Sequence, residues 1–373
     1  MDEIQYQFEY PTRIPSVFIG AGGHSFRNVL PAMQYAPVDL RAVCDLKLDR
    51  AEAYARIFGA PEAYTDYREM LEKEKPTAAF IVTDHKPDED GLVRATAIAA
   101  DCLRAGVNVW MEKPTAASTA EIRELMRLSE ESGAILVTGM NKIFMPSIQK
   151  AKQIISTPEF GRVTSVYARY PLGLPDEEGR RIEDLEMTMG FRDHVYHVGA
   201  VMNYLGGPIS RISYEWEAIN HSTVASVLFE SGAIGSIYFA AGSGAASPLD
   251  RFEVIGEGGN LVIENTLRLT YYRSGDSGLG AYGRGASYIV DDAVAPVVWE
   301  PEYSLSQLYN KNIFYLGYVN EVLHFCESVL NGAAPTLGTL EQSAEIMALY
   351  ETYRRIGPGV IGPVISDDDL PAA

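Results

Sequence analysis

Hydrophobic and polar positions in the first 140 residues follow two alternating patterns. Short apolar runs rich in Val, Ile and Phe are each followed by a stretch with apolar residues every three or four positions. The runs predict buried strands, and the longer period predicts amphipathic helices. This alternation predicts an α/β fold, a doubly wound parallel sheet with helices on both faces. We expect strands at 16–20, 39–45, 77–83, 107–111 and 134–139, and helices up to Met33 and at 48–59, 67–75, 94–106 and 118–133.

Strands dominate the second half of the chain. Alternating apolar and polar positions with Gly or Asn between the runs predict an α+β domain built on a large, mainly antiparallel open sheet. The strands are expected at 162–171, 209–218, 223–230, 233–242, 251–259, 260–265 and 267–273, and helices at 146–156, 193–205, 312–329 and 339–355. A chain of 373 residues is too long for one ordinary core. We therefore divide it into residues 1–141, with an N-terminal arm at 1–13, and residues 142–373.

Composition and charge narrow the class of protein. Hydrophobic residues make up 47% and charged residues 22%, as in ordinary globular proteins, and the net charge is −19. So acidic a chain is not expected to bind nucleic acid or an anionic membrane. The first 13 residues lack the apolar core of a secretion signal, and no apolar run has the length of a membrane span. Cys44, Cys102 and Cys326 lie far apart in apolar segments, which indicates buried thiols in a reducing compartment. We expect a cytoplasmic protein.

A glycine cluster, GAGGHS at residues 20–25, follows the first predicted strand and opens a predicted helix. Gly20, Gly22 and Ser25 hold the first, third and sixth positions of the dinucleotide fingerprint, with Ser where Gly or Ala is usual. In that motif the missing Cβ atoms let a pyrophosphate approach the helix amides. The motif also requires an acidic residue at the end of the next strand, and Asp45 lies there. A plain strand–turn–helix is the alternative interpretation.

Two further groups carry candidate chemistry. Glu112-Lys113-Pro114 follows the strand at 107–111, where ligands bind in open α/β sheets, although most loop lysines are only solvated. Asp193 and His197 are four residues apart, so a helix places both on one face. An imidazole suits a proton acceptor at neutral pH, and the carboxylate can fix its tautomer or bind a neighbouring hydroxyl.

The blander interpretation of the Asp193–His197 pair is an ion pair on a helix surface. A metal site is the weaker hypothesis, because His194 points off the shared face and no second cluster completes a site. We expect no metal. Arg192 can bind a substrate oxygen or pair with an acidic neighbour, and the sequence does not decide between these roles.

Four motifs in this order resemble the Gfo/Idh/MocA family of oxidoreductases: GAGGHS, VCD ending at Asp45, EKP, and Asp-x-x-x-His on a helix of the second domain. The likeness extends from about Arg13 to Arg355. It implies NAD(P) binding by residues 1–141, sugar-like substrates for residues 142–373, and a homodimer or homotetramer built through the open sheet. It assigns the catalytic role to Lys113, Asp193 and His197, and cofactor contacts to Gly20, Ala21, Gly22, Gly23, His24, Ser25, Asp45, Thr83, Asp84, Glu112, Lys113 and Asn141.

The chain departs from the family pattern at two places. Asp84 stands where the family usually has Pro after Thr83, and His85 is interpreted as an exposed loop residue. After Asn141 the chain has Lys142, and Ile143 stands where Arg is commonest. The glycine-rich stretch 273–287 is either a substrate lid or a disordered connection.

The resemblance predicts an NAD-dependent dehydrogenase that acts on a secondary hydroxyl of a sugar, cyclitol or glycoside. Asp45 favours NAD over NADP, because its charge would repel a 2′-phosphate, and Lys47 could soften that preference. Two alternatives stay open. The first is a redox-neutral enzyme that oxidises a glycoside transiently, and the second is a non-catalytic regulator that senses a nucleotide.

Overall fold

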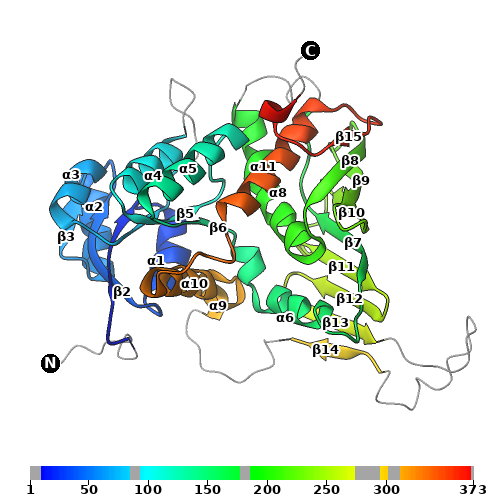
Figure 1. The fold of residues 1–373 in the computed structure, drawn as a ribbon, viewed down its shortest axis with the longest axis horizontal. Coiled ribbons are helices and arrows are strands. Elements are labelled where there is room, and N and C mark those ends of the chain that lie inside the picture. The colour runs from blue at the N-terminus through cyan, green and yellow to red at the C-terminus, as the bar shows by residue number, and fades with distance from the viewer. Residues whose placement is uncertain (1–9, 85–92, 177–184, 274–294, 301–310, 371–373) are drawn as a thin grey trace, which may run out of the picture.

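The computed structural model describes residues 10–84, 93–176, 185–273, 295–300 and 311–370 (Figure 1). Its first sheet is six-stranded and parallel, in the order β3-β2-β1-β4-β5-β6, as the alternating pattern predicts. The pattern did not predict β3, because three half-exposed residues at a sheet edge form no apolar run. The strands are β1 (Ile14–Ile19), β2 (Val38–Cys44), β3 (Glu62–Tyr64), β4 (Ala78–Ile81), β5 (Asn108–Glu112) and β6 (Leu136–Gly139).

Helices connect these strands, and their ends follow the capping signals of the sequence. Gly59 ends the second helix with a φ of 82°, the left-handed conformation that favours glycine. The Ser118 hydroxyl accepts from the Glu121 amide, but the Glu121 carboxylate accepts from the Ala117 amide, so the capping box is incomplete. The helices are η1 (Ser25–Val29), α1 (Leu30–Met33), α2 (Leu48–Phe58), α3 (Tyr67–Glu74), α4 (Arg94–Arg104) and α5 (Thr119–Ser132).

The second sheet has nine strands among the described residues, in the order β14-β13-β12-β11-β7-β10-β9-β8-β15. Neighbouring strands are antiparallel except β7 and β10, which are parallel, so the sheet is mixed and mainly antiparallel as predicted. The strands are β7 (Val163–Tyr170), β8 (Ile209–Trp216), β9 (Thr223–Phe229), β10 (Ile234–Phe239), β11 (Arg251–Gly256), β12 (Gly259–Glu264), β13 (Arg268–Arg273), β14 (Val297–Trp299) and β15 (Gly362–Pro363).

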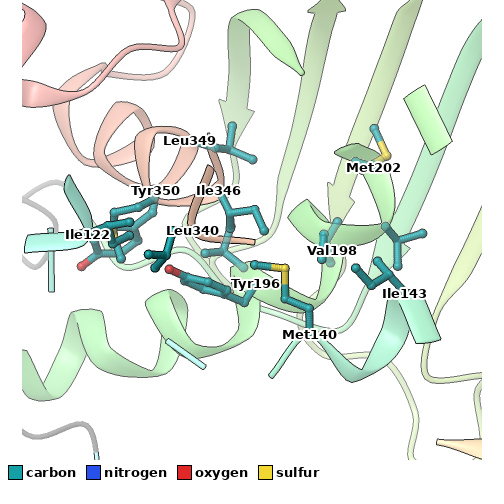
Figure 2. Packing of buried hydrophobic residues seen from close by; sticks show 14 of the residues in the cluster. Ile122, Met140, Ile143, Tyr196, Val198, Met202, Leu340, Ile346, Leu349 and Tyr350 are labelled. Carbon is teal, nitrogen blue, oxygen red and sulfur yellow. The ribbon is translucent and has the colours of Figure 1, made fainter. Parts of the chain in front are cut away.

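Three helices lie between the two sheets: α6 (Pro146–Ile155), α8 (Leu185–Gly206) and α11 (Leu340–Arg355) (Figure 1). Helix α8 begins eight residues before the predicted start at 193. Figure 2 shows the apolar contact that joins this layer to the first domain. In it, side chains of α8 and α11 pack with Met140 and Ile143, which lie at the 3₁₀ turn η2 (Asn141–Phe144) after β6. Helix α8 is therefore anchored to the parallel sheet through a shared core.

The chain returns to the first domain after the second sheet. Helix α10 (Tyr318–Asn331) buries Phe325 against Phe80 of β4, with ring centroids 5.3 Å apart. The helix predicted at 312–329 is divided into α9 (Lys311–Tyr315) and α10, because Gly317 has a φ of +85°. A Cβ there would lie 2.3 Å from the Asn141 carbonyl oxygen. The division at residue 141 stays a prediction.

The described chain ends with a 3₁₀ turn, η5 (Asp367–Asp369). All three cysteines are buried and free, as their apolar segments predict. Within the described residues, each helix is either too short or too polar to cross a membrane.

Candidate cofactor and catalytic site

The glycine loop lies where the strand order reverses between β1 and β4. Gly20 has a φ of +107°, and a Cβ on it would lie 2.0 Å from the carbonyl oxygen of Val82 at the end of β4. Only glycine fits there. Gly22 differs, since a Cβ on it would meet no described atom within 4 Å. Gly20 therefore serves the packing of the two strands, whereas the open side of Gly22 leaves room for a ligand.

Polar contacts hold this loop in place. One oxygen of the Asp45 carboxylate accepts from the Ala21 amide at 2.8 Å, and the other accepts from the Lys47 amide at 3.0 Å. Ser25, in the sixth position, donates its buried hydroxyl to the Gly20 carbonyl at 2.6 Å. Tyr54 on α2 donates to the Gly22 carbonyl at 3.0 Å, a contact that sequence reasoning missed because no local motif marks it.

A cleft of about 560 Å³ opens beside the loop. Five of the residues predicted to contact the cofactor line it: Gly20, Gly22, Asp45, Thr83 and Asp84. The chain is helical from residue 23, and the first amides of a helix have no acceptor within that helix. This donor set fits a dinucleotide: the first amides of the helix would hold its pyrophosphate, and Asp45 would accept from a ribose hydroxyl. Sequence reasoning did not find the other polar lining residues, which include Arg50, Tyr67, Arg68 and Arg94.

A hydrogen-bonded path runs from the glycine loop towards the second domain. His24 Nε2 lies 2.8 Å from Glu112 Oε1, and the side-chain amide of Asn28 lies 3.1 Å from His24 Nδ1. With the amide nitrogen as donor, Nδ1 accepts and Nε2 donates to the carboxylate. The other Glu112 oxygen accepts from the Lys113 amide at 2.9 Å. The predicted cofactor residues His24 and Glu112 thus connect directly to Lys113, whose peptide bond to Pro114 is cis.

Lys113 and Asp193 meet across the domain boundary. Lys113 Nζ lies 2.5 Å from Asp193 Oδ1, and the two side chains are 12% and 33% exposed. Sequence reasoning left two roles open for Asp193, fixing the tautomer of His197 or binding a hydroxyl. In the structure its carboxylate instead pairs with Lys113, and no hydrogen bond joins it to His197. This pairing depends on the domain interface, which one helix's spacing does not show.

Burial lowers the pKa of His197 well below its usual value, and the nearby Lys113 and Lys142 cations lower it further. The half-buried imidazole is therefore neutral at pH 7. A neutral ring has a free lone pair on one nitrogen, so it can accept a proton. The cluster combines a cation and an uncharged base beside the end of β5.

A second ion pair lies close to this cluster. Lys142 and Asp250 are 3% and 0% exposed, and the Lys142 ammonium donates to both Asp250 and Thr266. The Lys142 ammonium also lies 5.6 Å from the ring centroid of Tyr170, at the end of β7. Asp250 and Tyr170 were missed at the sequence level, because contacts between residues so far apart in the chain leave no local pattern.

The remaining candidate residues differ in where they lie and in what they contact. Asn141 donates its side-chain amide to the Leu316 carbonyl at 3.0 Å and so braces the turn before α10. Arg192 is 1% exposed, and His194 contacts the Gly190 carbonyl through Nδ1 at 2.8 Å. A search of the described residues finds no group of three His, Cys, Asp or Glu side chains placed to hold a metal ion. His85 and residues 274–287 lie outside the described residues.

These features define a Rossmann domain joined to a sheet domain whose Asp193 pairs with Lys113 at the end of β5. The chain belongs to the Gfo/Idh/MocA family. Residues 14–140 match its oxidoreductase family domain with an NAD-binding Rossmann fold, and residues 148–262 match a C-terminal domain of the family. The resemblance seen in the four sequence motifs is thereby confirmed.

Curated relatives match part of the chain. Trans-1,2-dihydrobenzene-1,2-diol dehydrogenase of Mus musculus is 26% identical over 42% of this chain and 45% of its own length. D-xylose 1-dehydrogenase (NADP(+)) 2 of Haloferax volcanii is 29% identical over 51% of this chain and 57% of its own length. The chain thus spans about half the length of these relatives.

A solved structure with the same fold extends over nearly the whole chain. It is a levoglucosan dehydrogenase in complex with NADH and L-sorbose, with a TM-score of 0.74 and 16% identity. The alignment covers 95% of this chain and 100% of that one. At this identity the likeness shows the fold alone.

Proposed function

We propose that the protein is an NAD-dependent dehydrogenase that oxidises a secondary hydroxyl of a sugar, cyclitol or glycoside, or reduces the corresponding ketone. One observation carries this proposal. Lys113, ion-paired with Asp193 and close to a neutral His197, lies at the end of the strand whose Glu112 contacts the glycine loop through His24. A proton acceptor and a cation therefore lie beside a dinucleotide cleft.

Each side chain has a defined task in this proposal. His197 accepts the hydroxyl proton, because its neutral imidazole has a free lone pair. The Lys113 ammonium has three hydrogens and uses one for Asp193, so the others can stabilise a substrate alkoxide. Asp193 holds that ammonium in position. Bound NAD supplies the hydride acceptor, and the glycine loop with Asp45 would hold it.

The proposed substrate class rests on the substrates for which two relatives are named. The Mus musculus and Haloferax volcanii proteins are named as dehydrogenases of a cyclic diol and of D-xylose. A neutral base and a paired cation suit such uncharged alcohols. No observation favours the redox-neutral alternative. The non-catalytic alternative would not need Lys113, Asp193 and His197 to be assembled at the cleft.

NAD is the proposed cofactor. Each oxygen of the Asp45 carboxylate accepts one backbone amide and keeps a lone pair for a ribose hydroxyl, and its charge disfavours a 2′-phosphate. Lys47, Arg50 and Arg94 line the same cleft and oppose that effect. The Haloferax volcanii relative is named for NADP(+), so the relatives do not choose between the two cofactors.

The direct test is a screen of neutral polyols with NAD and NADP. The panel contains D-xylose, levoglucosan, myo-inositol and trans-cyclohexane-1,2-diol, with nicotinamide absorbance as the readout. We expect reduction of NAD by at least one of them, and turnover at least about 100-fold slower by His197→Ala with the same compound. NAD binding without turnover of any panel member or reduction of any matching ketone would favour the regulator.

We also propose that the open sheet mediates a homodimer or homotetramer. One face of the sheet packs on the helical layer, and its other face presents Val224, Ile234 and Val298 at 51%, 62% and 50% exposure. Apolar residues grouped on one face commonly mark an interface. Light scattering coupled to size exclusion should give a mass of two or four chains, and Ile234→Glu should reduce it. A monomeric wild type at micromolar concentration would contradict this proposal.

A further inference from the structure

The hydroxyl of Tyr170 is a polar group with no assigned task. Tyr170 ends β7, and the residue as a whole is 4% exposed. Among the described residues, its hydroxyl has no hydrogen-bond partner, whereas the hydroxyls of Tyr196 and Tyr214 are both hydrogen-bonded. The Tyr170 oxygen is not one of the fully enclosed unpaired atoms, so it reaches a surface that a ligand can contact. An unpartnered donor at such a surface, next to a candidate active site, indicates a group that can bond a ligand.

The neighbours of Tyr170 belong to the proposed catalytic cluster. Its ring centroid lies 6.1 Å from that of His197 and 6.2 Å from that of His194. Burial raises the pKa of Tyr170, and the Asp250 and Asp193 carboxylates raise it further. The phenol therefore keeps its proton at neutral pH and acts as a hydrogen-bond donor.

The charged lysine and aspartate side chains around Tyr170 form two ion pairs. Lys113 pairs with Asp193, and Lys142 pairs with Asp250, so both lysines that act on His197 already have a carboxylate partner. Neither lysine therefore offers an uncompensated positive charge to an acidic substrate, although Lys113 keeps two N–H donors for the reacting oxygen. The groups that remain among these residues to bind the rest of the substrate are uncharged.

We propose that Tyr170 positions the substrate by donating a hydrogen bond to a second hydroxyl, next to the one that His197 deprotonates. The substrate class is then a neutral vicinal diol or polyol rather than a simple alcohol or an acid. This inference rests on the proposed dehydrogenase function and adds a specificity residue to it. Tyr170 holds the substrate's second hydroxyl, and the proton transfer belongs to His197.

The test compares Tyr170→Phe with Tyr167→Phe. Tyr167 lies on the same strand three residues earlier and therefore faces the opposite side of the sheet, so its variant is a matched control. The probes are D-xylose and trans-cyclohexane-1,2-diol, with cyclohexanol as the analogue that lacks the second hydroxyl. Steady-state kinetics with NAD and equilibrium binding of the same probes to the NADH complex are measured for each protein.

We expect Tyr170→Phe to raise KM for the diol or sugar roughly 5- to 100-fold, the range for a buried group left unpaired. Its kcat should change less, its NAD affinity should not change, and its preference for the diol over cyclohexanol should shrink by the same factor as KM rises. Tyr167→Phe should match the wild type. If the wild type oxidises a probe and Tyr170→Phe keeps its KM, or both variants lose equally, this inference is wrong and the proposed function stands. A wild type that neither binds nor oxidises D-xylose or the diol, nor any other panel member, overturns both.

Discussion

The candidate cofactor cleft and the proposed catalytic cluster are built in different ways. The cleft lies within the first domain, where the glycine loop and the ends of neighbouring strands line it, and the Ala21 amide donates to Asp45, 24 positions away. The cluster consists of side chains that meet over long separations, 80 positions for Lys113 and Asp193 and 108 for Lys142 and Asp250. The proposed cofactor site thus depends on the first domain alone, whereas the proposed catalytic cluster depends on the interface between the domains. Substitutions in the two regions should therefore change different quantities.

The largest effect is expected in the cluster. Replacing Lys113 or His197 by Ala should lower kcat by about 10²- to 10⁴-fold, the range for losing a positioned acid–base group. The dissociation constant for NAD should stay within about threefold, because the residues that hold the dinucleotide are untouched. Lys73→Ala, on the surface of α3, is the control for general effects of removing a lysine. Near-normal turnover in either cluster variant, with the fold intact, would contradict the mechanism.

Gly20 and Gly22 of the loop sharpen the comparison within the cleft itself. Gly20→Ala should destabilise the protein by roughly 2–4 kcal/mol, since its Cβ would overlap the Val82 carbonyl in a strained backbone conformation. Gly22→Ala meets no described atom, so its melting temperature should not change, but NAD affinity should fall about tenfold or more. Thermal unfolding and NAD titration of both variants separate the effects. Equal losses of stability would show that the open side of Gly22 is not a ligand surface.

Asp193→Asn should have an intermediate effect. The neutral amide still reaches the Lys113 ammonium but removes the charge that holds it, so kcat should fall about 10- to 100-fold, less than in His197→Ala. Steady-state kinetics with NAD measure this loss, and the dissociation constant for NAD should stay unchanged because Asp193 lies outside the cofactor cleft. A kcat equal to that of the wild type would mean that the ion pair does not position Lys113.

A smaller effect, on the choice between NAD and NADP, is expected from a substitution at Asp45. Asp45→Ser removes the negative charge while keeping a hydroxyl near the Ala21 amide. The ratio of kcat/KM with NAD to that with NADP should fall about tenfold or more, because Lys47, Arg50 and Arg94 then face the 2′-phosphate without opposition. If the wild type already uses both cofactors equally, Asp45 does not select the cofactor.

The smallest effect concerns stability rather than activity. Glu321 on α10 is 0% exposed, and burial followed by the nearby Glu112 charge raises its pKa well above the usual value. Folding therefore takes up a proton between the unfolded and folded pKa values. The stability contribution is full below the unfolded value, near 4.3, and is lost as pH rises towards the folded one.

Glu321→Gln does not titrate, so its melting temperature relative to wild type should rise between pH 5 and pH 8. The difference in unfolding free energy should grow by at most about 1.4 kcal/mol per pH unit. Glu124→Gln, on the exposed face of α5, provides the control. A constant difference across this range would mean that Glu321 is already ionised in the folded protein.

The sequence by itself determined the features that depend on near neighbours in the chain. The spacing of hydrophobic residues distinguished the parallel sheet from the mainly antiparallel one, and the spacing of the glycines with Asp45 pointed to residues that line one cleft of the structure. These patterns are readable because strand, turn and helix preferences act over a few residues. The i, i+4 spacing likewise placed Asp193 and His197 on one helix face.

Tertiary structure alone decided what each of those groups contacts. It pairs Asp193 with Lys113 rather than with His197, buries Lys142 against Asp250, brings Tyr170 beside His197 and returns α10 to the first sheet. Such contacts depend on how two domains and several helices pack together, and on the loss of water at their interface. That loss of water, together with the nearby lysines, also sets the pKa of His197. Because neither packing nor desolvation leaves a short-range pattern, the sequence carries no local sign of them.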